Sequence, residues 1–125
     1  MNVNELKPGD WVIFPNENKP CRIEEINSQF VDGLYCGRCY IKDLEPVPLT
    51  EEILLKNGWI CSIGLDYNFL PYNKFCKYGL TLDEYTDGVF SVDYGNLRTK
   101  ITYVHELQHL LWVFNKGDIE LLKEF

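Results

Sequence analysis

Hydrophobic residues in the first 48 positions come in short runs that are divided by turn residues. Residues 11–14 follow a Pro-Gly-Asp turn, and in residues 21–26 the apolar side chains alternate imperfectly with charged ones. A period near two is typical of strands that bury one face. Two more turn signals, Asp32-Gly33 and Gly37-Arg38, bracket further strand-like pieces. We interpret this succession of short strands in residues 1–48 as a small SH3-like β-barrel.

The next eleven residues, LTEEILLKNGW, change to a helical pattern. Thr50 is a good N-cap residue, and Glu51 and Glu52 complement the positive end of a helix. Gly58 suits the left-handed residue that commonly follows a helix end. The pattern therefore predicts a short helix in this segment.

The second half of the chain contains strand signals and one more helix. Residues 64–75 are rich in aromatic side chains and are interpreted as irregular, whereas residues 80–94 alternate around an Asp87-Gly88 turn and predict a β-hairpin. In residues 103–114, apolar side chains recur at helical spacing, and LLWVF is apolar nearly all round. This pattern predicts a C-terminal helix that is packed on both sides.

The predicted fold class is therefore α+β. It consists of an SH3-like β subdomain at residues 1–48, followed by a short helix, a β-hairpin and a C-terminal packing helix. Residues 49–125 form the α+β half, and we expect the two parts to pack as one globular unit.

Composition and charge argue against a membrane protein and against a DNA-binding protein. Of the 125 residues, 46% are hydrophobic, yet no apolar run is long enough to cross a bilayer and no signal peptide is visible. We therefore expect a cytoplasmic protein without membrane contact. The net charge of −7 argues against direct DNA binding, which depends on clustered Lys and Arg. An acidic decoy for a nucleic-acid-binding protein is an alternative.

The chain has five cysteines, an odd number that argues against a disulfide framework in a cytoplasmic protein. We expect reduced thiols that pack as small hydrophobic side chains. Cys36-Gly37-Arg38-Cys39 is interpreted as a two-residue hairpin turn flanked by a cross-strand cysteine pair. The alternative is a structural zinc site in which these two thiolates join two histidines of the last helix.

The last predicted helix contains His-Glu-Leu-Gln-His, the arrangement that zinc peptidases use. His105 and His109 would lie on adjacent turns of one face and could share a metal ion, with Glu106 as general base. Trp112 and Asn115 stand where the extended motif has Gly and a third His. Our preferred interpretation is a packing helix with these three side chains on its partly exposed face, without cofactor or metal. A zinc site is the alternative.

Residues 66–78, which precede the predicted β-hairpin, contain aromatic side chains with lysines between them. Such side chains can stack on a planar ligand or anchor a partner. The candidate ligand-binding residues are Tyr67, Phe69, Tyr72, Lys74, Lys77 and Tyr78.

The segments PVPLTEEILLKNGW and ITYVHELQHLLWVF, with the opening LKPGDWV, resemble a family of small uncharacterised proteins of prophages and mobile elements in gut bacteria. The resemblance covers most of the chain. In that family the last helix commonly has Gln at the position of Glu106 and often Asn at that of His109, which implies a packing helix. The resemblance also implies a phage or mobile-element accessory protein in a bacterial cytosol.

We therefore expect a non-enzymatic accessory protein that binds a host protein or a small ligand. Sequestration of a signal nucleotide in counter-defence would be one such role. The alternative is a zinc-dependent hydrolase in which His105 and His109 hold the metal and Glu106 is catalytic.

Overall fold

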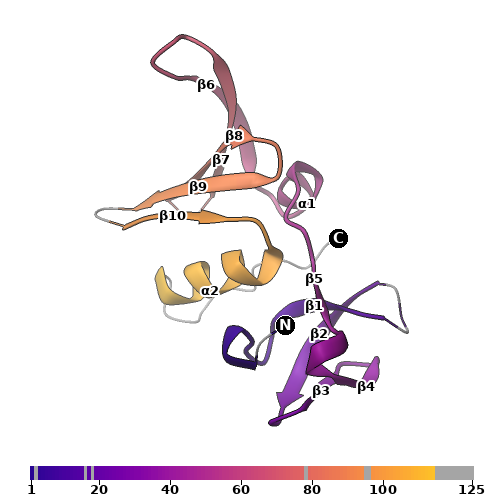
Figure 1. Cartoon of the computed structure of the whole chain (residues 1–125). Helices are drawn as coiled ribbons and strands as arrows, with labels where there is room; N and C mark the ends of the chain where they lie inside the picture. The colour runs from indigo at the N-terminus through magenta and orange to yellow at the C-terminus, as the bar shows by residue number, and fades with distance from the viewer. Residues whose placement is uncertain (2, 16, 18, 78, 95–96, 115–125) are drawn as a thin grey trace. The chain divides into compact units, whose positions relative to one another are not determined.

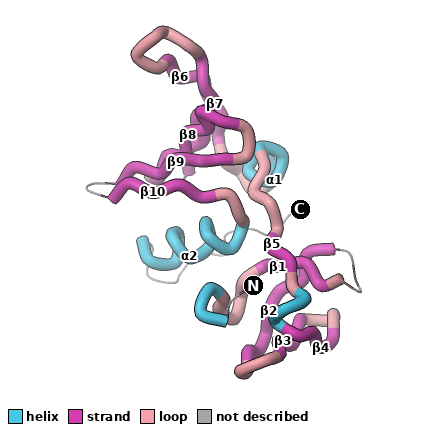
Figure 2. Tube along the Cα trace, in the orientation of Figure 1, coloured by secondary structure: helices cyan, strands magenta, loops and turns pink. Residues whose placement is uncertain are grey.

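The computed structural model describes residues 1, 3–15, 17, 19–77, 79–94 and 97–114 and shows a mixed α+β protein. The described strands form two antiparallel sheets of five strands each (Figure 1). Figure 2 shows the helices and strands along the same trace. The α+β class expected from the sequence is therefore confirmed.

The described residues group into two compact units, one of residues 1–48 with 103–114 and one of residues 49–102. The sequence pattern predicted that the terminal helix belongs with residues 49–102 in the α+β half. In the structure this helix, α2 (Val104–Phe114), groups with the N-terminal strands and contacts β1 (Trp11–Phe14). Its grouping follows from side-chain contacts of long sequence separation, which a local pattern does not contain.

The first sheet has the strand order β4-β3-β2-β1-β5. It is open, since no pairing between its outer strands β4 and β5 is found among the described residues. A 3-10 helix, η2 (Ile41–Asp43), lies between these two strands in the chain, and a second one, η1 (Val3–Glu5), precedes β1. The remaining strands of this sheet are β2 (Lys19–Ile26), β3 (Phe30–Gly33), β4 (Gly37–Tyr40) and β5 (Glu45–Pro46).

The hairpin between β3 and β4 corrects one prediction. Gly33 pairs with Gly37 and Val31 with Cys39, so the turn consists of residues 34–36. The predicted pairing of Cys36 with Cys39 across a two-residue turn is therefore wrong. Gly37 has φ +76°, and its backbone freedom is used at the start of β4 rather than at the centre of the turn.

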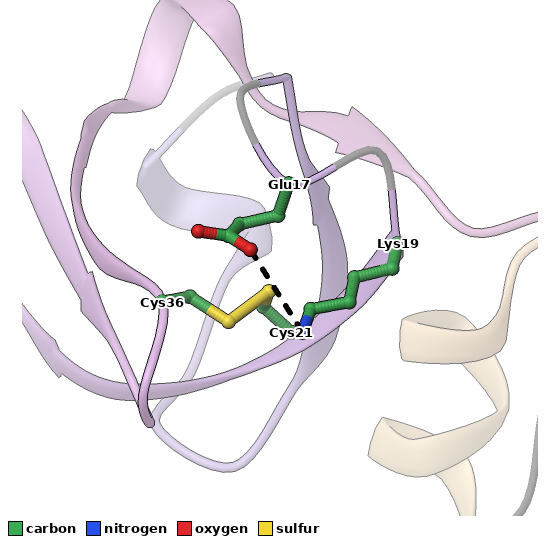
Figure 3. The surroundings of a disulfide bond; sticks show 4 residues. All are labelled: Glu17, Lys19, Cys21 and Cys36. Carbon is green, nitrogen blue, oxygen red and sulfur yellow. Dashed lines mark ion pairs between the residues drawn. A yellow bond between two sulfur atoms is a disulfide. The ribbon is translucent and has the colours of Figure 1, made fainter.

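The expectation of reduced thiols is corrected for two of the five cysteines, because Cys21 and Cys36 form a disulfide (Figure 3), whereas Cys39, Cys61 and Cys76 are free. The β3–β4 turn folds against β2, where Leu34 N donates a hydrogen bond to Arg22 O at 2.8 Å. This contact brings the two cysteine Cα atoms to 6.4 Å, within the range that a disulfide spans. Sequence spacing gave no sign of it, since 15 residues separate the two positions.

The core of the first sheet forms on its alternating apolar positions. Cys21 and Ile23 are buried, as the alternation in β2 predicted. The buried cluster comprises Leu6, Val12, Phe14, Cys21, Ile23, Val31, Ile41 and Leu44.

The second sheet is a meander with the strand order β10-β9-β8-β7-β6. The sequence predicted only the hairpin at Asp87-Gly88, which is present, with Gly88 at φ +77°. Residues 66–70 of the aromatic stretch form a turn, as an irregular segment would, but the residues on either side of this turn belong to two paired strands, so the prediction is wrong for them. The strands are β6 (Ile60–Leu65), β7 (Pro71–Lys77), β8 (Leu80–Thr86), β9 (Val89–Tyr94) and β10 (Leu97–Ile101).

The predicted short helix is present as α1 (Glu51–Lys56). Thr50 Oγ1 accepts a hydrogen bond from Ile53 N at 3.2 Å, which is the N-cap contact that the sequence predicted. Gly58 follows the helix with φ +83°. Leu54 and Trp59 are buried, together with apolar residues of the sheet such as Phe75, Leu82 and Phe90.

Candidate functional site

The β6–β7 hairpin, residues 60–77, carries the aromatic residues that the sequence singled out. We call it the arm, and its turn extends past the neighbouring strands of the sheet (Figures 1 and 2). Tyr67 and Phe69 lie in this turn with exposed fractions of 102% and 79%. Two predicted contact residues are therefore fully presented to solvent.

Hydrogen bonds within the turn of the arm fix its conformation. Asp66 Oδ1 accepts bonds from Asn68 N at 2.8 Å and Leu70 N at 2.9 Å. Asp66 N donates to Leu70 O, and Phe69 N donates to Asp66 O, both at 3.0 Å. Phe69 has φ +61°, a left-handed conformation that is uncommon for a bulky residue. The turn holds an aromatic side chain outward in a strained backbone conformation.

Further along the arm, Tyr72 lies on β7 and packs against its neighbours. Its ring centroid is 4.4 Å from that of Tyr85, and Lys74 Nζ lies 5.8 Å from the Tyr72 ring. The Tyr72 ring also covers Gly64 on β6, where an added Cβ would lie 2.3 Å from Tyr72 Cζ. Gly64 is therefore required for the close approach of this ring, which ties the two strands of the arm together.

The other predicted ligand-binding residues do not join this group. Lys77 Nζ donates to Asn57 O at the C-terminal end of α1, where a cation complements the helix dipole. The Lys77 side chain therefore contacts the end of α1 and not the turn of the arm. Tyr78 lies outside the described residues.

The structure adds apolar residues to the arm that the sequence analysis missed. Each has more than half of its side chain exposed, although β-branched and aliphatic residues of a strand are usually buried. For the three residues of β6, the only available signal was the uncharged run ICSIGL, which matches a buried strand equally well, and Leu70 lies outside this run. The added exposed residues are Ile60, Ile63, Leu65 and Leu70.

The second candidate region is the His-Glu-Leu-Gln-His segment of α2. Glu106 Oε1 accepts a hydrogen bond from Tyr103 N at 3.0 Å, which is the reciprocal half of a capping box at the helix start. Leu107 is fully buried, as the predicted apolar stripe with Val104 and Leu111 required. These contacts give Glu106 and Leu107 structural roles.

The two following residues of the motif hold the turn before β1. Gln108 Nε2 donates to Gly9 O, and Gln108 Oε1 accepts from Trp11 N, both at 2.9 Å. His109 Nε2 lies 2.7 Å from Asp10 Oδ2, and Asp10 Oδ2 also accepts a hydrogen bond from Lys7 N. We call this set of contacts the turn clamp. Asp10 is a site residue that sequence reasoning missed, because 99 residues separate it from His109.

Two predictions about α2 need correction. His105 is not on a partly exposed face, because only 4% of it is exposed, and its ring stacks with that of Tyr103 at a centroid distance of 6.0 Å. The end of the helix is not packed on both sides, because Trp112 and Val113 are 53% and 60% exposed. A single buried stripe therefore positions this helix. Asn115 lies outside the described residues.

Burial of His105 has a consequence for acid stability. Burial lowers the pKa of His105 from its ordinary value of 6.5, and His109 also lowers it, while Asp10, Glu106 and Glu5 oppose the shift. The unfolded chain therefore takes up the proton first, so the free energy of unfolding should fall as pH drops below about 6.5. We expect His105→Gln to weaken this acid dependence, measured by urea unfolding between pH 7.5 and 5.5. Equal acid slopes in the two proteins would contradict the expectation.

The alternative of a Cys2His2 zinc site does not form, because Cys36 is bonded to Cys21. Within the described part of the chain, no three His, Cys, Asp or Glu side chains are grouped closely enough to hold a metal ion together. Burial is the largest cause that raises the pKa of the Cys39 thiol, which favours its protonated form.

Comparisons with protein-family models, with curated proteins and with solved structures found no match to this chain. None of the described helices is long and apolar enough to span a membrane.

Proposed function

We propose that this protein is a non-enzymatic binding protein that contacts a partner protein through the β6–β7 arm. The observation that carries the proposal is the exposure of the arm. Its turn presents Tyr67 and Phe69 almost completely to solvent, and Ile63 and Leu65, which share one face of β6, are exposed next to this turn. Contiguous exposed apolar side chains in a soluble domain commonly mark an interaction site.

The shape of the arm favours a protein partner over a small ligand or nucleotide. Small molecules are usually bound in concave sites that bury most of their surface, whereas Tyr67 and Phe69 project from a turn. Aromatic side chains on a fixed turn suit insertion into a pocket of another protein, where they act as anchors. Lys77, one of the expected basic contacts, is bonded to Asn57 O instead.

The outer edge of the arm offers a second contact. β6 is the outermost strand of its sheet among the described strands, and its six residues, Ile60–Leu65, carry no charge. Natural edge strands are usually protected by charges, proline or short length. An uncharged edge of this kind supports addition of an extended partner segment by backbone hydrogen bonds.

The first unit supports the same class of protein. The strand order β4-β3-β2-β1-β5, with η2 between β4 and β5 in the chain, matches the connectivity expected of the SH3-like barrel that we propose for residues 1–48. The context of a phage or mobile-element accessory protein in a bacterial cytosol is part of the proposal and depends on the sequence resemblance alone.

The test combines Tyr67→Ser with Phe69→Asn, because asparagine tolerates a positive φ. Partners captured by cross-linking from a bacterial lysate are purified, and their Kd is measured by calorimetry. We expect the double variant to lose about 2 kcal/mol or more of binding free energy, which is about thirtyfold in Kd.

Tyr35→Asn is the matched control, because Tyr35 is also an exposed aromatic residue in a hairpin turn, with 95% exposure and φ +62°. We expect this variant to bind as the wild-type protein does. Equal Kd values for wild type and the double variant would refute the proposal. Sedimentation of the wild-type protein as an arm-dependent dimer would show that the arm instead binds a second copy.

A further inference from the structure

A cavity of about 360 Å³ lies beside the first half of α2 in the first unit. Side chains of three segments surround it, including both histidines of the chain, which has only two. The cavity is lined by Met1, Glu5, Pro46, Tyr103, His105, Glu106 and His109.

The buried imidazole of His105 is the feature of this cavity that contacts within the fold do not explain. It is 96% buried, because only 4% of it is exposed, and its Nδ1 has no hydrogen-bond partner among the described residues. A buried polar atom without a partner costs free energy, of the order of 1–3 kcal/mol. Other motif residues, Glu106, Gln108 and His109, all have structural hydrogen bonds. A ligand bound to the His105 imidazole would remove this free-energy cost.

His109 faces the same cavity, one helical turn away. The two ring centroids are 5.7 Å apart and the rings are inclined by 73°. Asp10 holds the Nε2 atom of His109 at 2.7 Å, which leaves Nδ1 as its second nitrogen. An imidazole with one nitrogen bonded to a carboxylate is the usual state of a metal-binding histidine, because the carboxylate orients the ring and raises its basicity.

Charge around the two rings favours a cation. The carboxylates of Glu5 and Glu106 line the cavity, and Asp10 is 96% buried against His109, with a side-chain exposure of 4%. No lysine or arginine lines the cavity. A cation with an affinity for imidazole nitrogen would satisfy both the charge and the unpartnered nitrogen.

We propose that this cavity binds a divalent transition-metal ion of the zinc type through His105 and His109, with Asp10 as a positioning residue. The coordination is completed by solvent, since the described residues contain no group of three ligating side chains. The site differs from a zinc peptidase site, because Glu106 is engaged at the helix start. It is also independent of the arm, which contributes no residue to it.

Nuclear magnetic resonance provides a direct test, because both imidazoles can be assigned in a chain with two histidines. The full chain is first alkylated at its free cysteines, Cys39, Cys61 and Cys76, so that thiolates do not compete. Zinc chloride is then added at pH 7.5. We expect both imidazoles to shift together and to saturate at one zinc per chain.

Single-residue variants then identify the side chains that bind zinc. His105→Gln and His109→Gln should each lower zinc affinity at least tenfold, and Asp10→Asn should lower it about 10- to 100-fold by calorimetry. Asp32→Asn, which removes a carboxylate from β3 of the same unit, should leave affinity unchanged. Circular dichroism checks that each variant is folded.

The wild-type titration by itself can overturn the proposal. No imidazole shift up to millimolar zinc, or a shift of only one imidazole, would exclude a shared site. Affinity that survives removal of either histidine would place the bound metal elsewhere.

Discussion

Reduction of the Cys21–Cys36 bond is expected to lower the free energy of unfolding of the first unit by about 3 kcal/mol. The bond closes a loop of 15 residues, and a crosslink of that span restricts the unfolded chain by about this amount. Such a loss is large beside the 5–15 kcal/mol that is typical of a whole domain. The effect should be confined to the first unit, since both cysteines belong to it.

Amide hydrogen exchange with mass spectrometry measures this effect unit by unit. Exchange in β1 to β3 should accelerate about 100-fold in Cys36→Ser, while β7 to β9 of the second unit serve as the internal reference. We choose Cys36 because it is partly exposed, whereas substitution of the buried Cys21 would also disturb packing. Cys61→Ser is the matched control. Equal exchange in Cys36→Ser and wild type would show that the bond contributes nothing to stability.

The disulfide also has a consequence for the cellular compartment of the protein. Disulfides are rare in reducing cytosols and persist in oxidising environments. A chain held in the bacterial cytosol, as the resemblance implies, would therefore have its first unit in the less stable, reduced form. Thiol labelling of the protein in intact cells distinguishes the two states.

Gln108→Ala is expected to destabilise the first unit by about 2–4 kcal/mol. The amide side chain bonds both Gly9 O and Trp11 N, and each part-buried backbone group that loses a partner costs about 1–3 kcal/mol. Because Gln108 is the residue of the turn clamp that bonds on both sides of Asp10, its loss should also loosen the contact of Asp10 with His109. Urea unfolding followed by exchange at the Trp11 amide would measure both effects.

Two further variants test whether the loss of stability comes from the two hydrogen bonds of Gln108. Gln108→Glu keeps the acceptor for Trp11 N but loses the donor to Gly9 O, so it should be intermediate between wild type and Gln108→Ala. Gln29→Ala, at an exposed position of the same unit, should change stability by less than about 0.5 kcal/mol. A Gln108→Ala protein as stable as Gln29→Ala would show that the turn clamp is dispensable.

Local signals in the sequence were sufficient where neighbouring residues decide the structure. The strand β1 after the Pro-Gly-Asp turn, the Thr50 cap of α1 and the Asp87-Gly88 hairpin all follow from contacts within a few residues. The buried stripe Val104, Leu107 and Leu111 was predicted correctly for the same reason.

The arm shows where local patterns fail. An uncharged apolar run such as ICSIGL predicts a buried strand, and nothing in it indicates that Ile63 and Leu65 are exposed. Their exposure depends on what the other face of the sheet packs against, which the run itself does not contain. Tyr67 and Phe69, which the sequence singled out as contact residues, are exposed, but the turn around Asp66 that presents them was not evident from the sequence.

The sequence by itself determined the α+β class, the capped helix α1 and the amphipathic stripe of α2. Only the tertiary structure decided what the His-Glu-Leu-Gln-His segment contacts, since Asp10, Gly9 and Trp11 lie about a hundred residues away along the chain. It also decided the Cys21–Cys36 bond, which spans two strands and a turn. The physical reason is common to both. Caps, turns and periodic burial depend on residues near in sequence, whereas the partner of a buried polar or sulfur atom is set by chain segments that meet only after folding.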